Sequence, residues 1–335
     1  MTDTTTLSMK PLVSIIVDGY NESRGLGKAS DTLEALRVQT FPMDQVELVL
    51  IGTSEQVRCW EDITAEKRPF GWLKVVTLDD AHYLELKNHG AECASGNIIV
   101  FTDSDVYPQP MWLASIVEGI ERGADVVVGI SLFKQSHSWK ADTATRQAAA
   151  SITWGWVLGK GESRLEGLCL AAGFMDHNVA FRREILEKVR YRTDLGRILG
   201  APLFYRALVD MGVKVGLHPS QRIVHFFSWW FWLHKLHFRY GYEVFMLRRL
   251  DAQYPNQWIA RTMLFEPVVT MIWHVLLDVP RWFRVSRLLG IHPVRRIAIF
   301  PLVVGMSCLA RTAEMAGMYI TMVAPQTMKR WAESV

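Results

Sequence analysis

The sequence predicts an α/β fold in which a mostly parallel sheet is flanked by helices. Apolar runs typical of buried strands occur at residues 12–17, 46–51, 73–78, 98–101 and 125–130, and helical patterns lie between several of them. Turn-forming or acidic residues follow these runs, for example Asp18-Gly19-Tyr20-Asn21-Glu22 and Asp79-Asp80. Alternating strands and helices form parallel sheets, which bind ligands beyond the carboxyl ends of their strands. We therefore expect the functional residues at those ends.

Local signals set the predicted helices. Asp31 with Glu34 three residues later resembles a capping box, and Phe41-Pro42 ends the helix that follows. Further helices are expected at 83–94, after Pro110, at 141–153, at 178–189 and at 203–211, with a short strand at 213–217. Residues 131–170 mix aromatic residues with glycines, as in Trp154-Gly155-Trp156. That composition suits either a cover that moves over a site or a plain surface loop.

Composition and charge differ between the two halves of the chain. Its 335 residues suffice for one large or two small domains, and half of them are hydrophobic. Residues 1–180 carry 15 Lys and Arg against 24 Asp and Glu, whereas residues 181–335 carry 22 against 10. A basic, aromatic-rich half suggests an anionic membrane surface or an anionic substrate. The basic residues are interleaved with long apolar runs, so no nucleic-acid partner is expected.

The cysteines and the N-terminus favour a cytoplasmic setting. The four cysteines are far apart and form no Cys-x-x-Cys pair, so we expect reduced thiols. Residues 1–10 form a polar, threonine-rich tail with no apolar signal-peptide core. The catalytic part is therefore expected on the cytoplasmic side.

The predicted chemistry is centred on the strand at 98–101 and the two carboxylates that follow it. Asp103 and Asp105 are one residue apart, and Pro108 and Pro110 then end the strand and open a helix. A hard divalent cation takes carboxylate oxygens and bridges to substrate phosphates, so this pair suits a metal–diphosphate complex. A solvated acidic turn would contain the same residues, but their place after a buried strand favours the metal site.

Several stretches together resemble family 2 glycosyltransferases, whose catalytic domain has the GT-A fold. Val13–Val17 matches the family's first strand, and Tyr20-Asn21-Glu22 matches its nucleotide-contacting turn. Lys87-Asn88 matches the segment before the metal motif, and Asp103-Ser104-Asp105 matches the motif itself. The family's acceptor-side half is matched by Asn178 with Arg182-Arg183, by Arg206 with Gly212, and by His225. The likeness spans residues 11–240, and the tail from Arg295-Arg296 to Gly317 is similar to the membrane-associated ends of many members.

The resemblance implies a GT-A catalytic domain at 11–225 and a helical, membrane-associated region at 226–335. It implies that a nucleotide sugar is bound by Tyr20, Asn21, Glu22, Lys87, Asn88, Asp103 and Ser104. It also implies a divalent metal, Mn²⁺ or Mg²⁺, held by Asp103, Asp105 and His225. Imidazole nitrogen coordinates Mn²⁺ acceptably, although a lone histidine after a strand is often structural.

Two departures from the family pattern bear on the mechanism. Many members place an acidic residue at the end of the second strand, where this chain has Ile51-Gly52-Thr53. Glu55 or Asp79 would have to compensate, or the donor base is read differently. The family also has Glu-Asp about five residues before the arginine matched by Arg206, with that Asp as general base, and this chain has Gly200-Ala201.

Three explanations of the missing base stay open. Asp176, which could instead cap a helix, is the first substitute, with His177 and Asp194 as further candidates. A phosphate acceptor, such as a polyprenyl phosphate, is already ionised at pH 7 and needs no base. The third explanation is a protein that binds a nucleotide sugar without transferring it.

The C-terminal region carries the signals of membrane association. Residues 225–250 combine many aromatic residues with Lys235, Arg239, Arg248 and Arg249, as in an interfacial helix, although an internal helix would also fit. Apolar stretches follow at 265–279 and 297–310, and the second is interrupted by Arg311 and Glu314. A span needs about 20 predominantly apolar residues, so this one qualifies only if the charged pair is hidden in a helix contact. Interfacial association, re-entrant or spanning helices, and a soluble tail all stay open.

These observations predict a metal-dependent, inverting glycosyltransferase at the cytoplasmic face of the inner (plasma) membrane, serving the cell envelope. It would transfer a sugar from a nucleotide-sugar donor to a lipid or lipid-linked acceptor. The alternatives are a catalytically impaired nucleotide-sugar-binding or scaffold protein and a polyprenyl-phosphate glycosyltransferase. A nucleotidyltransferase is less favoured, because Gly25-Leu26-Gly27-Lys28 only faintly resembles its Gly-rich, basic first turn.

Overall fold

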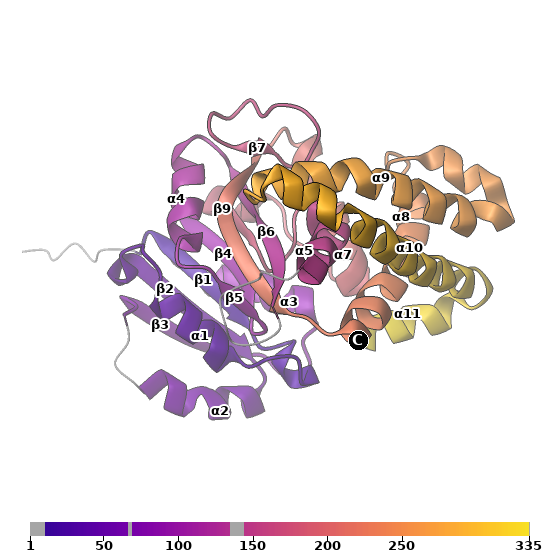
Figure 1. Cartoon of the computed structure of the whole chain (residues 1–335). Helices are drawn as coiled ribbons and strands as arrows, with labels where there is room; N and C mark the ends of the chain where they lie inside the picture. Colours follow the sequence, from indigo (N-terminus) through magenta and orange to yellow (C-terminus); the bar gives the residue numbers. More distant parts are fainter. Residues whose placement is uncertain (1–10, 66–68, 135–143, 335) are drawn as a thin grey trace, which may run out of the picture.

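One mixed sheet forms the centre of the molecule (Figure 1). The computed structural model describes residues 11–65, 69–134 and 144–334. Within these residues nine strands pair in the order β3-β2-β1-β4-β8-β6-β9-β5, and β7 also pairs with β9. The polar tail at 1–10 and the first residues of the helix predicted at 141–153 lie outside the described residues.

The parallel half of the sheet follows the predicted strands. It contains β1 (Val13–Asp18), β2 (Val46–Gly52), β3 (Trp72–Thr77) and β4 (Ile98–Asp103), all paired in parallel. Every residue of β1, β2 and β4 is buried, whereas β3 alternates between partly buried and exposed residues at the sheet edge. Strands covered on both faces read as continuous apolar runs, which is why the sequence located these strands.

The helices of this half differ from the prediction in two places. Helix α1 (Ala29–Arg37) begins before Asp31, which lies in its first turn and accepts a hydrogen bond from Tyr107 Oη at 3.0 Å. The capping box predicted at Asp31 is therefore wrong. Helix α2 (Ser54–Ala65) was not expected, and Asp79 accepts hydrogen bonds from the backbone and side chain of Ser54 at its start. Helix α3 (Tyr83–Cys93) lies where predicted.

The other half of the sheet is mostly antiparallel. Strand β8 (Val179–Arg182) pairs with both β4 and β6 (Val126–Lys134), and β9 (Val215–Phe226) pairs with β5 (Val106–Pro108), β6 and β7 (Cys169–Leu170). The helix predicted at 178–189 is wrong over its first half, where β8 fills the gap between two strands; only α6 (Arg183–Lys188) is helical. Long-range pairing overrides local helix propensity here.

The remaining helices cover the sheet. These are η1 (Glu22–Arg24), η2 (Met43–Gln45), α4 (Trp112–Glu121), α5 (Ala144–Trp154), η3 (Gly155–Val157) and α7 (Gly196–Asp210). Helix α7 begins earlier than predicted, because Pro202 lies inside it at a position where a sequence pattern would place a boundary. Helix α5 packs on β6 and also contacts the C-terminal helices α9 and α10, so it joins the two parts of the molecule.

The chain after β9 is helical and packs beside the sheet, in orange to yellow in Figure 1. It consists of the π-helix η4 (Phe231–Phe238), α8 (Arg239–Leu250), η5 (Gln257–Phe265), α9 (Glu266–Leu288), α10 (Pro293–Val323) and α11 (Pro325–Ser334). Trp232 and Leu236 are buried, whereas Trp229 and Trp230 are exposed. Helix α11 returns to α7, and Tyr20 Oη donates to Glu333 O at 3.4 Å.

The charged pair that interrupts the last apolar stretch is hidden in a helix contact. Arg311 donates to both carboxylate oxygens of Asp278 on α9, to Glu314 and to the Ile152 carbonyl of α5. Both Arg311 and Glu314 are buried. The helices at Gln257–Leu288 and Pro293–Val323 are long and apolar enough to cross a membrane, with 22% and 28% of their most apolar windows buried inside the protein. The sequence allowed a spanning helix here only if Arg311 and Glu314 were hidden in a helix contact, and that condition is met.

Candidate active site

A buried ion cluster lies at the carboxyl ends of β1 and β4. Asp18 and Asp103 are register neighbours on these strands, and Lys87 of α3 reaches between them at 2.8 and 2.7 Å. All three side chains are completely buried. Burial raises the pKa of Asp18 to about 7. Burial opposes ionisation of Asp103 as well, but the Lys87 ammonium holds the pKa of Asp103 below its usual value of 3.8.

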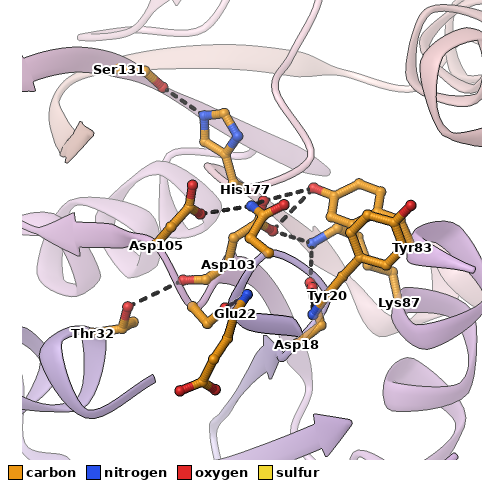
Figure 2. A network of polar contacts seen from close by, with 12 residues as sticks. Asp18, Tyr20, Glu22, Thr32, Tyr83, Lys87, Asp103, Asp105, Ser131 and His177 are labelled. Atoms are coloured by element: carbon orange, nitrogen blue, oxygen red, sulfur yellow. Dashed lines mark hydrogen bonds and ion pairs between the residues drawn. The ribbon is translucent and has the colours of Figure 1, made fainter. Parts of the chain in front are cut away.

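Asp103 is held from several directions (Figure 2). Its carboxylate accepts hydrogen bonds from Lys87, from Tyr83 Oη at 3.0 Å and from Asn21 Nδ2 at 3.1 Å. Thr32 Oγ1 donates to the carbonyls of Asp103 and Val106, which fixes the turn between the two aspartates. Asp103 is therefore held in one position, and the Lys87 ammonium balances its charge on the side away from the cavity.

Asp105 is the more accessible carboxylate of the pair. Its Oδ1 accepts a hydrogen bond from Asn21 Nδ2 at 2.7 Å, and its Oδ2 lies 3.7 Å from Nδ1 of His225 on β9. The side chains of Asp105 and His225 are 12% and 7% exposed. Gly27 has a φ of +78° and leaves no room for a Cβ, which would lie 2.6 Å from Asp105 Cα. The loop after β1 therefore closes directly over Asp105.

A second histidine lies beside His225. His177 Nε2 is 3.1 Å from His225 Nε2 and 3.0 Å from Ser131 Oγ, and the Trp154 ring lies 5.0 Å from the His225 ring. Burial, and then the neighbouring His225, lower the pKa of His177 well below 6.5. A neutral imidazole at this place can hold His225 in orientation through their shared contact.

Asp103, Asp105, His177 and His225 face a cavity of about 860 Å³ that extends into the C-terminal helices. Its wall near β4 includes Asn21, Asp103 and Asp105, and its far wall includes Arg311 and Glu314. Asp176 and Ala201 also line it. Burial raises the pKa of Asp176 to about 6, and its buried Oδ1 has no hydrogen-bond partner among the described residues.

Ala201, at the position of the family's usual base, faces the cavity but carries no carboxylate. Ala201 lies on α7 at the wall of the cavity. At the preceding position, a Cβ on Gly200 would lie 2.0 Å from Leu84 Cδ1, so a larger residue requires Leu84 to move. The local packing of α7 on α3 therefore accommodates Gly200 and Ala201. Asp194, a further candidate base, is exposed and paired with Arg192.

The predicted nucleotide-binding residues divide into two groups. Tyr20, Asn21, Glu22 and Ser104 cluster around the turn after β1, where Ser104 Oγ accepts a hydrogen bond from Glu22 N at 3.2 Å and Trp60 Nε1 donates to Glu22 at 2.9 Å. Lys87 lies behind Asp103 and is not part of the cavity wall. Asn88 exchanges two hydrogen bonds with the backbone of Tyr191. Direct contact of Lys87 and Asn88 with a nucleotide stays a prediction, and this geometry gives both a structural use.

The donor set at Asp105 fits a divalent cation. A carboxylate oxygen and an imidazole nitrogen face each other across 3.7 Å, a pairing that Mn²⁺ accepts. Among the described residues no three His, Cys, Asp or Glu side chains converge as a complete metal cage. Such a cation would therefore take its remaining ligands from phosphate oxygens and water, as is usual in nucleotide sites.

Comparison with known proteins identifies the family. Residues 14–190 match the family described as Glycosyl transferase family 2. The chain belongs to glycosyl transferase family 2. It is thus a glycosyltransferase, as the sequence predicts.

Two relatives come from Haloferax volcanii. Glycosyltransferase AglE is 30% identical over 124 residues, which cover 36% of this chain and 40% of that relative. The match to AglE thus spans less than half of the relative's length. Glucosyl-dolichyl phosphate glucuronosyltransferase is 24% identical over 268 residues, 73% of this chain and 79% of that relative.

A solved structure confirms the fold. Mannosyltransferase PcManGT from Pyrobaculum calidifontis, determined with GDP-Man and Mn²⁺, has a TM-score of 0.57 to this chain at 15% identity. The superposition covers 95% of this chain and 89% of that one. The GT-A fold predicted from the sequence is therefore confirmed.

Sequence reasoning missed several residues of the site. Asp18 was assigned only to a turn, although its place at the end of β1, beside β4, puts it against Asp103. Tyr83, Arg197 and Arg239 line the cavity without belonging to a recognised motif. Their helices approach the site only in the folded chain, so no local pattern indicated them.

Proposed function

We propose that this glycosyltransferase transfers a sugar, with inversion, from a nucleotide-sugar donor to a lipid or lipid-linked acceptor. We propose further that transfer depends on a divalent metal and occurs at the cytoplasmic face of the membrane. The observation that carries the proposal is one continuous cavity, which joins the Asp103–Asp105 pair to the C-terminal helices. A donor at the carboxylates and an acceptor arriving along the helices would meet in this space.

The donor end of the proposal rests on the turn after β1 and on Asp105. Asn21 donates to both aspartates, so it couples the nucleotide-side turn to the proposed metal site. A divalent cation held by Asp105 and His225 would offset the charge that develops on the departing diphosphate. The structure of PcManGT with GDP-Man and Mn²⁺ supports a nucleotide sugar and a metal in this fold. Asp103, fixed by Lys87 and Tyr83, keeps Asp105 in place through the short turn between them.

Proton transfer depends on the acceptor. In the transfer step an acceptor oxygen forms a bond to the anomeric carbon, and the nucleoside diphosphate leaves with the electron pair of the broken bond. For a hydroxyl acceptor, the proton passes to the Asp176 carboxylate, which lines the cavity and has its pKa raised by burial to about 6. An ionised phosphate acceptor brings no proton, which would agree with Ala201 at the usual position of the base.

The acceptor class and the membrane are supported by the C-terminal region. Glucosyl-dolichyl phosphate glucuronosyltransferase is named for a lipid-linked substrate. In this chain, large apolar side chains at η5 and at the start of α10 are 67–76% exposed, namely Met263, Leu264, Phe265, Val294 and Ile297. Exposed apolar patches of this kind mark membrane or protein contacts. We keep residues 11–225 as the proposed catalytic domain and 226–335 as the proposed membrane-associated region.

The proposal is tested by transfer assays with a panel of nucleotide sugars, Mn²⁺ or Mg²⁺, and a membrane lipid extract. We expect metal-dependent release of the nucleoside diphosphate together with a labelled lipid product. Binding of a nucleotide sugar and metal without consumption of any donor would instead identify an impaired binding protein.

A further inference from the structure

The cavity wall is rich in cations, and most of them are already paired. Arg206 pairs with Asp210, Arg248 with Glu266, Arg281 with Asp278, and Arg311 with Asp278 and Glu314. Arg284 donates to the carbonyl of Gly159. Each of these has a structural use in the folded protein.

Arg197 and Arg239 differ from this group. Neither makes a salt bridge or a hydrogen bond to any described residue, although both line the cavity, and Nε of Arg239 is buried without an acceptor. A guanidinium nitrogen that is buried without an acceptor, as Nε of Arg239 is, loses its hydration with no hydrogen bond in return, so such groups are rare unless a ligand completes them. The two side chains are also close enough to repel, since burial and then the Arg197 charge lower the pKa of Arg239.

Glu243 supplies little compensation. It follows Arg239 by one turn on α8 and also lines the cavity, but no salt bridge joins the two side chains. Burial raises the pKa of Glu243 to about 8, so this group is mostly neutral at pH 7. Both guanidinium groups therefore line the cavity without a salt bridge to any described carboxylate.

Arg197 lies next to the proposed metal site, and Arg239 is close enough to Arg197 for their charges to interact. The Arg197 guanidinium stacks on the ring of Tyr83 at 4.1 Å and lies 5.1 Å from the ring of Tyr20. The hydroxyl of the same Tyr83 donates to Asp103. One tyrosine ring therefore separates the Arg197 guanidinium from the Asp103 carboxylate.

We propose that Arg197 and Arg239 form a binding site for a phosphoryl group next to the metal carboxylates. The group comes either from the diphosphate of the donor or from the phosphate of a lipid acceptor, so this inference rests on the proposed function. Two guanidinium groups match the charge of about −2 on a phosphate monoester at pH 7, and their fork geometry suits phosphate oxygens. A carboxylate ligand carries one negative charge and would balance only one of the two guanidinium groups.

The test measures binding to the purified full-length chain without turnover. The probes are inorganic pyrophosphate with Mn²⁺, farnesyl monophosphate, and glucuronate as a carboxylate control. Calorimetry on wild type, Arg239→Gln and Arg239→Lys gives the Kd of each probe. Arg192→Gln is the matched control, because it removes the same charge from an exposed arginine that pairs with Asp194 outside the cavity.

We expect Arg239→Gln to weaken binding of one phosphoryl probe by about tenfold or more, with partial retention in Arg239→Lys and no change in Arg192→Gln. A loss confined to farnesyl monophosphate assigns the site to the acceptor, and a loss confined to pyrophosphate assigns it to the donor. The proposal would be overturned if Arg239→Gln bound both phosphoryl probes with a Kd within about twofold of the wild-type value. It would also be overturned if only the Kd of glucuronate changed.

Thermal unfolding separates a binding role from a folding role. Removal of an unpaired buried charge should leave the ligand-free Tm of Arg239→Gln unchanged or raised, while the Tm gain from the probe disappears. A lower ligand-free Tm would assign Arg239 to the fold and overturn the inference. Because no step of this test consumes donor, failure of the transferase proposal would leave its result unaffected.

Discussion

At the scale of single residues, the two aspartates of the motif have different surroundings. Asp103 is fully buried and bound by Lys87, Tyr83 and Asn21, whereas Asp105 faces His225 and the cavity. We therefore infer that Asp105 provides the metal contact and that Asp103 holds the turn. The same comparison separates Lys87, which balances charge within the protein, from residues that meet a ligand.

Replacing Lys87 by Met tests the buried cluster. The change leaves Asp18 and Asp103 side by side in the core, and removal of one partner from a buried ion pair costs about 3–5 kcal/mol of unfolding free energy. Without the ammonium, both carboxylates have folded-state pKa values above the unfolded value, so they take up protons in the folded state as the pH falls. Urea denaturation should thus show a larger loss at pH 8 than at pH 5.

The double variant Lys87→Met/Asp18→Asn is the control, because it removes one of the two stranded carboxylates. It should recover part of the lost stability at pH 8. An equal loss for Lys87→Met at both pH values would contradict the buried ion cluster.

Asp176 gives a pH-dependent prediction. Its folded pKa of about 6 lies above the usual aspartate value of 3.8, so its ionisation destabilises the fold as the pH rises from about 4 to 6. Asp176→Asn should therefore raise stability at pH 8, by up to about 3 kcal/mol, and have little effect at pH 4. Denaturant midpoints at the two pH values check this, and a variant that is less stable at pH 8 would contradict it.

Activity separates the two kinds of acceptor. If Asp176 accepts the proton of a hydroxyl acceptor, Asp176→Asn should lower kcat by about 100-fold or more. For a phosphate acceptor, kcat should change little. The pH profile of wild type alone does not distinguish them, because the second pKa of a phosphate monoester is also about 6.

At the scale of elements, the cavity depends on how α8 crosses α10. The two helices touch through glycines. A Cβ on Gly317 of α10 would lie 2.0 Å from the carbonyl oxygen of Phe238, which directly precedes α8, and one on Gly241 of α8 would lie 2.2 Å from that of Glu314. Backbone atoms cannot move aside as a side chain can. This close approach sets the position of Arg239, two residues before Gly241.

Gly317→Ala should force α8 and α10 apart and destabilise the protein by about 1–3 kcal/mol, since overpacking displaces backbone. Gly305→Ala on the same helix is the matched control, because nothing lies within 4 Å of its Cβ position. The control should be neutral or stabilising by up to about 1 kcal/mol. Equal Tm values for the two variants would contradict the close crossing.

The sequence located elements whose pattern is local. Buried runs such as Ile98–Phe101 and the carboxylates that follow them were identified, because strands covered on both faces are continuously apolar. Strand β8 was mistaken for helix and α2 was missed, because the first is decided by pairing between β4 and β6 and the second has no clear apolar stripe. Arg197 and Arg239 were not predicted as site residues for the same reason, because only the packing of α7 and α8 brings them to the cavity.

At the scale of the whole molecule, the C-terminal helices bury a charged cluster within their apolar core and expose several large apolar side chains. Arg311, Asp278 and Glu314 are buried between α9, α10 and α5, while Leu264 and Ile297 are exposed. This arrangement is suited to a region that meets an apolar phase while keeping its charges inside. It agrees with the membrane association that we propose.

Vesicle flotation tests that association. Replacing Met263, Leu264 and Phe265 by Ser should reduce binding to anionic vesicles by about tenfold or more, since each buried apolar side chain contributes about 1.5–3 kcal/mol. The control Val38→Ser/Met111→Ser changes exposed apolar residues at the end of α1 and the start of α4, outside residues 226–335. Binding that is unaffected by the triple change would contradict a membrane contact at η5.

The most direct test of the central claim is metal-dependent turnover in the Asp105→Ala variant. With the donor identified from the panel, release of nucleoside diphosphate is measured with lipid acceptor across a range of Mn²⁺ concentrations. We predict that wild type shows saturable dependence on Mn²⁺ and that Asp105→Ala loses about 100-fold or more of kcat/KM, with a Tm close to wild type. Unchanged turnover and Mn²⁺ dependence in Asp105→Ala would show that the metal and the diphosphate are not held here.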